Sequence, residues 1–236
     1  MSAYGEIKRA STAAPLPSTV WAPPSKDGVV DGGRPVSIHH LTLATARGVP
    51  GLLEYLGGVF AKEIEDGLTY PQEGEVMQTT FEAYFFAADV FVGIVGQLSG
   101  NAMSPSETEG SLDILKEANQ RSWEECVAGY YYIKPNYPGR SSHICNAGFV
   151  VPPIHRRKGY GHLLARSYVH YAPQLGYQAS VFNLVYVNNF ASIRLWETLG
   201  FTKAGRIPRA GRLRKKDGEG EEYVDAWVIY KSFIDE

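Results

Sequence analysis

The segment from Ser142 to Tyr171 constrains the fold of this chain more than any other part of the sequence. An apolar, β-branched stretch at Ile144 to Val151 predicts a strand, which a proline pair ends. The basic run Arg156 to Lys158 then leads into Gly159-Tyr160-Gly161. Apolar positions at helical spacing follow, at Leu163, Leu164, Tyr168 and Tyr171. The segment therefore predicts a strand, a glycine loop and a helix in direct succession.

A strand, a glycine loop and a helix in this order favour the binding of an anion. The first turn of a helix leaves its N–H groups unpaired, the helix dipole favours negative charge there, and glycine lets a ligand approach the backbone. The loop lacks the terminal Lys-Ser/Thr of a P-loop, and it has only two of the three glycines of a dinucleotide fingerprint. We therefore expect a phosphate-bearing ligand other than a nucleoside triphosphate.

Hydrophobic periodicity divides most of the remaining chain into strands and helices. We expect strands at 36–46, 88–95, 126–133, 179–187 and 223–233, with a further strand before the last, and helices at 52–64 and 76–86. Gly67 supplies an end signal for the first helix. The polar residues 99–122 are interpreted as an insertion. This order of elements indicates one α/β domain.

Residues 1–35 differ in composition from the rest of the chain. Five prolines lie here, namely Pro15, Pro17, Pro23, Pro24 and Pro35, and the few apolar residues show no period. We predict a flexible arm rich in proline and glycine at 1–35 and a folded domain at 36–236. A mitochondrial presequence is a weaker interpretation, because the arm holds acidic residues and many prolines.

Composition and charge exclude several classes of protein. The 236 residues are 44% hydrophobic, and 23 basic against 25 acidic residues leave a net charge of −2. No global charge therefore directs the chain to nucleic acid or to an anionic membrane. Cys126 and Cys145 are too few for a disulfide framework and lack the spacing of a metal site. Because neither a spanning stretch nor a signal peptide is recognisable, we expect a cytoplasmic protein without a metal.

Two signatures together resemble one superfamily. Arg156-x-x-Gly159-x-Gly161 resembles the pyrophosphate motif of the GNAT acetyltransferases, and the stretch from Asn189 to Phe201 resembles their second signature. The resemblance implies a single GNAT-type domain, with a mixed central sheet of about six to seven strands flanked by helices. It also implies that the fourth and fifth strands splay apart and that acetyl-CoA is the co-substrate.

The resemblance assigns cofactor contacts residue by residue. It implies that the backbone of Phe149, Val150 and Val151 lines the pantetheine arm of acetyl-CoA. The pyrophosphate would lie on the amides of Arg157, Lys158, Gly159, Tyr160, Gly161 and His162, with Arg156 as the first residue of the motif. Asn189 would cap the next helix, reach the cofactor and act in catalysis. Trp196 stands at a cofactor-side position where the family often has an acidic tyrosine, and an indole N–H is not a usable acid.

Two asparagines interrupt the strands that are expected to splay. Asn146 lies in the fourth strand and Asn183 in the fifth, where a buried amide needs a partner. The surrounding sequences resemble fungal acetyltransferases that detoxify proline analogues such as azetidine-2-carboxylate and 4-hydroxyproline. That resemblance implies that Asn146 and the backbone of Asn183 and Leu184 bind the carboxylate of an amino acid, and that the enzyme is a homodimer.

Several alternatives remain open from the sequence. His143, His155, Glu82 and Glu125 are candidates for a general base, and a water-mediated route without a dedicated base is an equal alternative. The family resemblance implies a backbone oxyanion donor on the fourth strand, near Gly148 or Phe149. The acceptor could also be another amine, such as a polyamine, an antibiotic or a protein N-terminus. Trp196 leaves open a non-catalytic protein that binds acyl-CoA.

Overall fold

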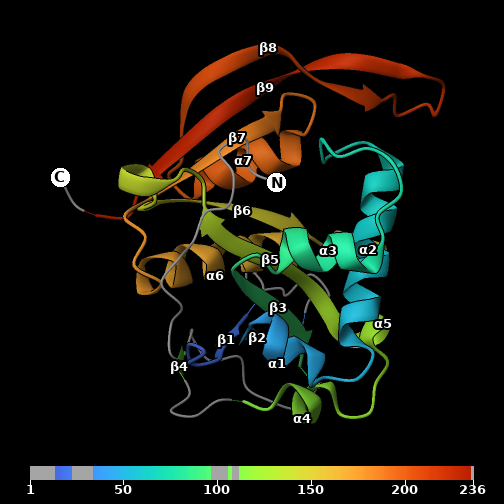
Figure 1. Cartoon of the computed structure of the whole chain (residues 1–236), viewed down its shortest axis with the longest axis vertical. Coiled ribbons are helices and arrows are strands. Elements are labelled where there is room, and N and C mark those ends of the chain that lie inside the picture. The colour runs from blue at the N-terminus through green and yellow to red at the C-terminus, as the bar shows by residue number, and fades with distance from the viewer. Residues whose placement is uncertain (1–13, 23–33, 97–105, 108–111, 235–236) are drawn as a thin grey trace, which may run out of the picture.

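The computed structural model describes residues 14–22, 34–96, 106–107 and 112–234, and it contains one mixed sheet (Figure 1). The sheet has nine strands in the order β4-β1-β2-β3-β5-β6-β7-β9-β8. Their bounds are β1 Thr19–Trp21, β2 Val36–Leu41, β3 Asp89–Val95, β4 Ser106–Glu107, β5 Val127–Pro135, β6 Ile144–Val150, β7 Ala179–Tyr186, β8 Thr202–Arg214 and β9 Glu221–Ser232. The strands predicted from the sequence are all present. The short strands β1 and β4 add to them.

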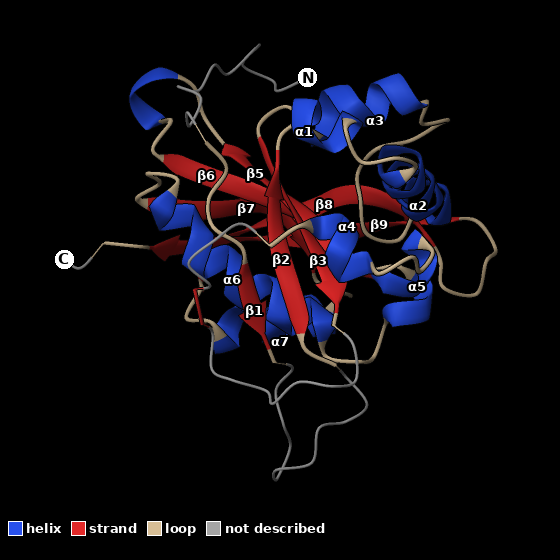
Figure 2. Cartoon of the chain, turned by 90° about the horizontal axis from the view of Figure 1, so that it is seen from below, coloured by secondary structure: helices blue, strands red, loops and turns tan. Residues whose placement is uncertain are grey.

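Helices cover both faces of this sheet (Figure 2). They are α1 Leu43–Arg47, α2 Leu52–Asp66, α3 Gln78–Phe85, α4 Ile114–Ala118, α5 Trp123–Cys126, α6 Tyr160–Gln174 and α7 Phe190–Thr198, with single 3₁₀ turns at Gly139–Ser141 and Pro153–His155. The predicted apolar stripe of α2 is buried, and α2 ends at Gly67, whose φ of 65° is left-handed. The expected α/β architecture is therefore confirmed.

Alternation along β5 divides the interior into two cores. Tyr131 and Ile133 pack with α6 and α7 on one face, whereas Tyr130 and Tyr132 pack with α2 and α3 on the other. Successive strand residues point to opposite faces, so one strand serves both cores. We refer below to the α6 face and the α2 face of the sheet.

The fourth and fifth predicted strands, β6 and β7, diverge as expected. They pair in parallel at Ile144↔Ala179 and Cys145↔Ser180, and no further register pair joins them. Every other strand pair in the sheet is antiparallel. The backbone edges of both strands are therefore free of each other beyond residue 145.

The first described residues correct the prediction of a flexible arm at 1–35. β1 pairs with β2, and Trp21 lies in the core with 5% of its surface exposed. The Tyr171 hydroxyl donates to the Pro17 carbonyl and shares a 2.8 Å hydrogen bond with Thr19. A three-residue strand is too short to show a period in sequence, so this pairing was missed. Residues 1–13 and 23–33 lie outside the described residues.

Smaller differences concern where elements begin and end. The strand predicted at 36–46 stops at Leu41, because Thr42 caps α1 with its side chain. The strand predicted from Cys126 begins at Val127, because Ser122 and Glu125 form a capping box that starts α5. Much of the insertion predicted at 99–122 lies outside the described residues. Within the described part of the chain, no helix is long and apolar enough to cross a membrane.

Candidate functional site

The predicted glycine loop joins β6 to α6 as a strand, loop and helix. Gly159 is the N-cap of α6 with a left-handed φ of 77°, which glycine adopts at little cost. The first backbone donor of the helix to find a partner is Leu163, whose N–H reaches the Gly159 carbonyl at 3.1 Å. Among the described residues, the amides of Tyr160, Gly161 and His162 have no hydrogen-bond acceptor. The loop therefore presents free donors at a helix N-terminus.

The glycine loop also has open space in which an anion could bind to these amides. A Cβ atom built on Gly161 would have no atom within 4 Å among the described residues. Arg157 takes a positive φ of 62°, an uncommon conformation for a side chain of this size. The loop backbone is thus bent and uncovered where a diphosphate is expected.

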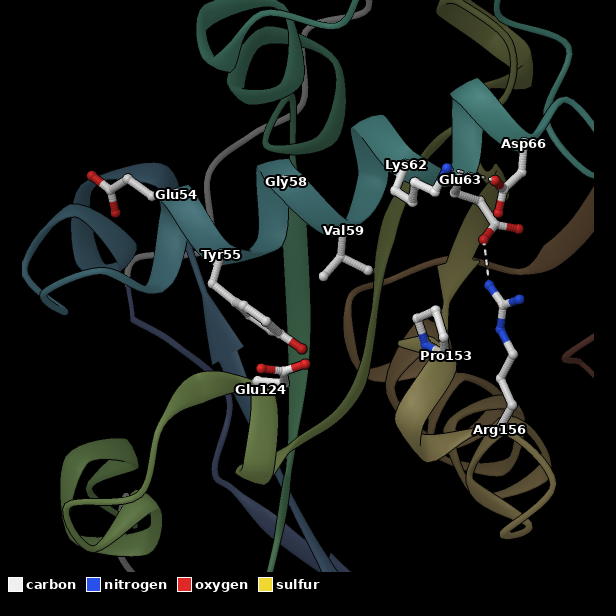
Figure 3. Close-up of a pocket in the computed structure, with 10 residues that line it drawn as sticks. All are labelled: Glu54, Tyr55, Gly58, Val59, Lys62, Glu63, Asp66, Glu124, Pro153 and Arg156. Carbon is white, nitrogen blue, oxygen red and sulfur yellow. Dashed lines mark hydrogen bonds and ion pairs between the residues drawn. The ribbon is translucent and has the colours of Figure 1, made fainter.

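Arg156, the first residue of the motif, points towards Glu63 of α2 (Figure 3). Its Nη2 atom lies 2.6 Å from Glu63 Oε2, and its Nε donates to the Val151 carbonyl at 3.1 Å. In this structure its charge is therefore paired with a carboxylate. Between α2 and the loop lies a hollow of about 360 Å³, which is lined by Glu54, Tyr55, Gly58, Val59, Lys62, Glu63, Asp66, Glu124, Pro153 and Arg156.

The backbone predicted to line the pantetheine lies on the divergent edge of β6. The Phe149 carbonyl accepts a hydrogen bond from the Tyr70 hydroxyl at 3.0 Å, and Val151 accepts the one from Arg156. Tyr70 lies in the loop between α2 and α3, and burial raises the pKa of its phenol well above the usual value. Sequence reasoning missed Tyr70, because a tyrosine in a loop carries no signal of a contact with a distant strand.

Trp196 is a core residue on the α6 face. It is 5% exposed, and its ring lies 4.5 Å from that of Phe182 and 5.2 Å from that of Phe149, centroid to centroid. The indole thus fills the space between β6, β7 and α7. Phe149 belongs to the strand that is expected to line the cofactor. Trp196 therefore contacts that strand from the α6 face of the sheet.

Asn189 has the predicted capping role. Its Oδ1 atom accepts the Ser192 N–H at 3.2 Å and so satisfies a donor in the first turn of α7. The residue follows directly after the turn at the end of β7 and is partly exposed.

The structure brings the two predicted strand asparagines together through a third. Asn136 Oδ1 accepts from Asn146 Nδ2 at 3.0 Å and from Asn183 Nδ2 at 2.7 Å, and Asn136 donates back to Asn183 Oδ1 at 3.2 Å. The Oδ1 atom of Asn146 is buried without a hydrogen-bond partner among the described residues. We call Asn136, Asn146 and Asn183 the amide cluster. Asn136 was missed because its Pro-Asn-Tyr-Pro-Gly context indicated only a turn.

Leu184 lies beside Asn183 in a bulge of β7. The register of β7 with β9 shifts between Phe182 and Val185, so residues 183 and 184 leave the regular ladder. Bulges expose backbone groups and occur next to active sites. This irregularity lies on the strand that diverges from β6.

Several candidate bases are engaged elsewhere. Glu82 pairs with Arg47 at 2.7 Å, and Glu125 caps α5, so hydrogen bonds lower the pKa of both carboxyl groups. His155 is buried and bonded to the Glu124 carbonyl, and desolvation lowers its pKa. His143 is exposed and contacts the Arg140 carbonyl. None of these contacts involves the amide cluster.

A second hollow, of about 670 Å³, lies between the end of α2, the loop at 67–76 and the β8–β9 hairpin. Arg212 crosses it to pair with Glu73 and Glu221 at 3.1 Å each. No group of three residues suited to hold a metal ion occurs among the residues that the structure describes.

Comparison with known proteins identifies the family. Residues 102–201 match the model of the Acetyltransferase (GNAT) family. The chain is 43% identical over 171 residues to N-acetyltransferase aca1 of Schizosaccharomyces pombe, covering 72% of this chain and 75% of that protein. The chain belongs to the GNAT acetyltransferase family. It is thus an N-acetyltransferase, as the two signatures predicted.

The chain is also similar to further proteins in sequence or in fold. Protein SPT10 of Saccharomyces cerevisiae is 28% identical over 222 residues, which are 81% of this chain but 34% of that protein. A GCN5-related N-acetyltransferase from Kribbella flavida superposes with a TM-score of 0.62 at 20% identity, over 84% of this chain and 97% of that one. A phosphinothricin acetyltransferase from Sinorhizobium meliloti, solved in complex with acetyl-CoA, superposes with a TM-score of 0.57 at 16% identity. The superposition covers 84% of this chain and 88% of that one.

Proposed function

We propose that this N-acetyltransferase acetylates the amine of a small amino acid, a cyclic secondary amine such as azetidine-2-carboxylate or 4-hydroxyproline. The observation that carries the proposal is the amide cluster, which lies where β6 and β7 diverge and holds a buried acceptor without a partner. A buried, unpaired amide oxygen is unfavourable until a ligand donates to it. The substrate would contact Asn146 and the backbone of Asn183 and Leu184.

The glycine loop supports acetyl-CoA as the co-substrate. Three unpaired amides and the open space above Gly161 fit a diphosphate, with Arg157 and Lys158 adding positive charge. Arg156 would support the loop from its ion pair with Glu63. The backbone of Phe149, Val150 and Val151 would line the pantetheine arm, and Trp196 would support that strand through its ring contact with Phe149. When bound, acetyl-CoA supplies the acetyl group as a reactive thioester.

The residues of this chain would orient the amine and stabilise charge rather than form a covalent intermediate. A backbone N–H near Gly148 or Phe149 would donate to the carbonyl oxygen as negative charge develops on it. Asn189 would position the reacting groups at the start of α7, in the catalytic role that the family resemblance implies. Because Trp196 offers no acidic proton, the departing thiolate would be stabilised by a hydrogen bond from Asn189, or would be protonated by water or by the proton that the amine loses.

The proposal extends to assembly and location. The 13-residue β8 ends the sheet, and it carries an exposed row that includes Ile207. Unprotected edges of this length invite pairing with another chain. We propose a cytoplasmic homodimer in which a second copy covers this edge. A single species of monomer mass in sedimentation at assay concentration would contradict the dimer.

A thiol-release assay tests the proposed substrate class. Purified protein is incubated with acetyl-CoA and with cyclic imino acids, primary amino acids or polyamines, and free CoA is measured. We expect turnover of the imino acids above the other classes, and loss of turnover in Gly159→Glu, whose carboxylate would repel the diphosphate. Turnover confined to polyamines would assign another amine. Acetyl-CoA binding without turnover of any amine would favour a non-catalytic acyl-CoA binder.

A further inference from the structure

Lys134 lies on the α2 face at the end of β5, with its ammonium between two aromatic rings. Its Nζ atom is 4.0 Å from the ring centroid of Tyr84 and 4.1 Å from that of Tyr132. It also donates to the Tyr84 carbonyl at 3.3 Å, near the end of α3. Desolvation by burial lowers the pKa of Lys134 to about 8. The side chain is therefore a cation held in a partly buried, aromatic setting.

This cation has no anionic partner within the described part of the chain. Arg47, Arg156 and Arg206 each pair with a carboxylate, and no such pair includes Lys134. The groups that face it are the phenols of Tyr84 from α3 and Tyr132 from β5, which are joined by a 3.0 Å hydrogen bond. A desolvated charge without a counter-ion is costly, and an anion of the ligand would offset that cost.

The cross-strand neighbour of Lys134 is Asn146 of the amide cluster. The two residues are register partners between β5 and β6, so their side chains leave the same face with Cβ atoms about 5 Å apart. Asn146 donates an N–H to Asn136, and its buried Oδ1 atom has no hydrogen-bond partner among the described residues. A cation and a vacant acceptor therefore lie side by side. A carboxylate complements the Lys134 ammonium, and an amine N–H complements the Asn146 oxygen. An amino acid carries both groups on one carbon.

We propose that Lys134 binds the carboxylate of the acceptor amino acid while Asn146 Oδ1 accepts a hydrogen bond from its amine, an inference that rests on the proposed function. The family resemblance assigns the carboxylate to Asn146, and this inference moves it to Lys134 because the Asn146 Nδ2 atom already donates to Asn136. The bulge at Asn183 and Leu184 adds neutral backbone donors beside the same site. The arrangement also favours reaction, because a nearby cation lowers the pKa of the bound amine and so raises its neutral, nucleophilic fraction. Lys134 thus selects amines that carry a carboxylate.

Paired substrates isolate this role. The kcat/KM values for azetidine-2-carboxylate and for azetidine, which lacks the carboxylate, are measured for wild type, Lys134→Met and Lys134→Arg. Met keeps the length and apolar stem without the charge, and Arg keeps the charge. We expect the preference for the carboxylate substrate to fall about 10- to 100-fold in Lys134→Met, the range of a hydrogen bond between charged groups. Lys134→Arg should retain most of it. Lys116→Met, an exposed lysine of α4, is the matched control.

Measuring the preference for the carboxylate substrate across a pH series separates a binding role of Lys134 from a structural role. The ammonium is charged below its pKa of about 8 and neutral above it, so the wild-type preference should be full at pH 7 and decline as the pH rises past 8. A ratio between two amines largely cancels the deprotonation of the amines themselves. In Lys134→Arg the preference should persist to higher pH, because guanidinium stays charged.

The outcomes separate the two proposals. Equal losses for azetidine-2-carboxylate and azetidine in Lys134→Met, with a lowered melting temperature, would make Lys134 a structural contact of α3 and overturn its role alone. Failure of the wild type to turn over any amino acid, with acetyl-CoA still bound, would overturn the proposed function and this inference together.

Discussion

At the scale of single residues, the site depends on atoms that the fold leaves without partners. The amides of Tyr160, Gly161 and His162 and the Oδ1 atom of Asn146 are polar groups for which the described residues provide no acceptor or donor. A helix N-terminus leaves its first amides free to bind an anion, and a buried side-chain oxygen is rarely left unpaired, so both are places where a ligand can bind. By contrast, Trp196 is a packing residue, which explains how an indole is tolerated where the family often has tyrosine.

Gly161→Glu tests the loop at this scale. A Cβ atom there meets nothing among the described residues, so the fold should tolerate a side chain. The added carboxylate would repel the diphosphate that we expect on the loop amides. We expect the Kd for acetyl-CoA to rise at least tenfold in calorimetric titration. Gly205→Glu in β8 adds the same charge in open space and should leave the Kd unaltered. Equal affinity in both variants would contradict the assignment of the loop.

At the scale of elements, neighbouring strands set the geometry of the α2 face. Gly148 of β6 lies opposite Tyr132 of β5, and a Cβ atom on Gly148 would come 2.6 Å from that ring. The glycine therefore lets the Tyr132 ring lie across β6, where it supports the Lys134 ammonium. The divergence of β6 from β7 and the bulge of β7 complete the arrangement.

Gly148→Ala should disturb both stability and the acceptor side. Because the Tyr132 ring must move, we expect a loss of about 1–3 kcal/mol in the free energy of unfolding, measured in urea. The KM for the amino acid should rise more than the KM for acetyl-CoA. Gly205→Ala in β8, where a Cβ atom meets nothing among the described residues, should change neither. A fully stable Gly148→Ala protein would show that the ring has room to shift.

At the scale of the whole molecule, the sheet extends well beyond the part that forms the site. β1 pairs with β2 near the end of the sheet opposite to β8. Trp21 of β1 is packed in the core on the α6 face. Its indole N–H donates to Thr19 at 2.7 Å, and the guanidinium of Arg166 lies 5.2 Å from its ring centroid. Residues 14–22 therefore belong to the domain.

Trp21→Ala tests this enlarged domain. Removing a buried tryptophan from a core costs about 3–5 kcal/mol in the free energy of unfolding. The urea concentration at the midpoint of unfolding should fall accordingly. Phe190→Ala removes an aromatic ring that is 76% exposed and should change stability by no more than about 0.5 kcal/mol. Similar small effects in both variants would support the flexible arm that composition predicts.

The sequence by itself determined the elements and the chemistry of the cofactor loop. Periodicity predicted α2, and the glycine spacing predicted the unpaired amides at the start of α6, because both depend on residues close together in the chain. The likeness of the two signatures also predicted the GNAT family, which the comparison confirmed.

Only the tertiary structure decided which distant residues meet. Asn136 joins Asn146 to Asn183, Tyr70 reaches the Phe149 carbonyl, and Lys134 loses its solvent between two tyrosines, all through contacts made by separate elements. Such contacts arise from strand register and packing, which leave no local pattern. The sequence determined the local geometry of the site, and long-range packing determined which of its groups stay unpaired and ready to bind.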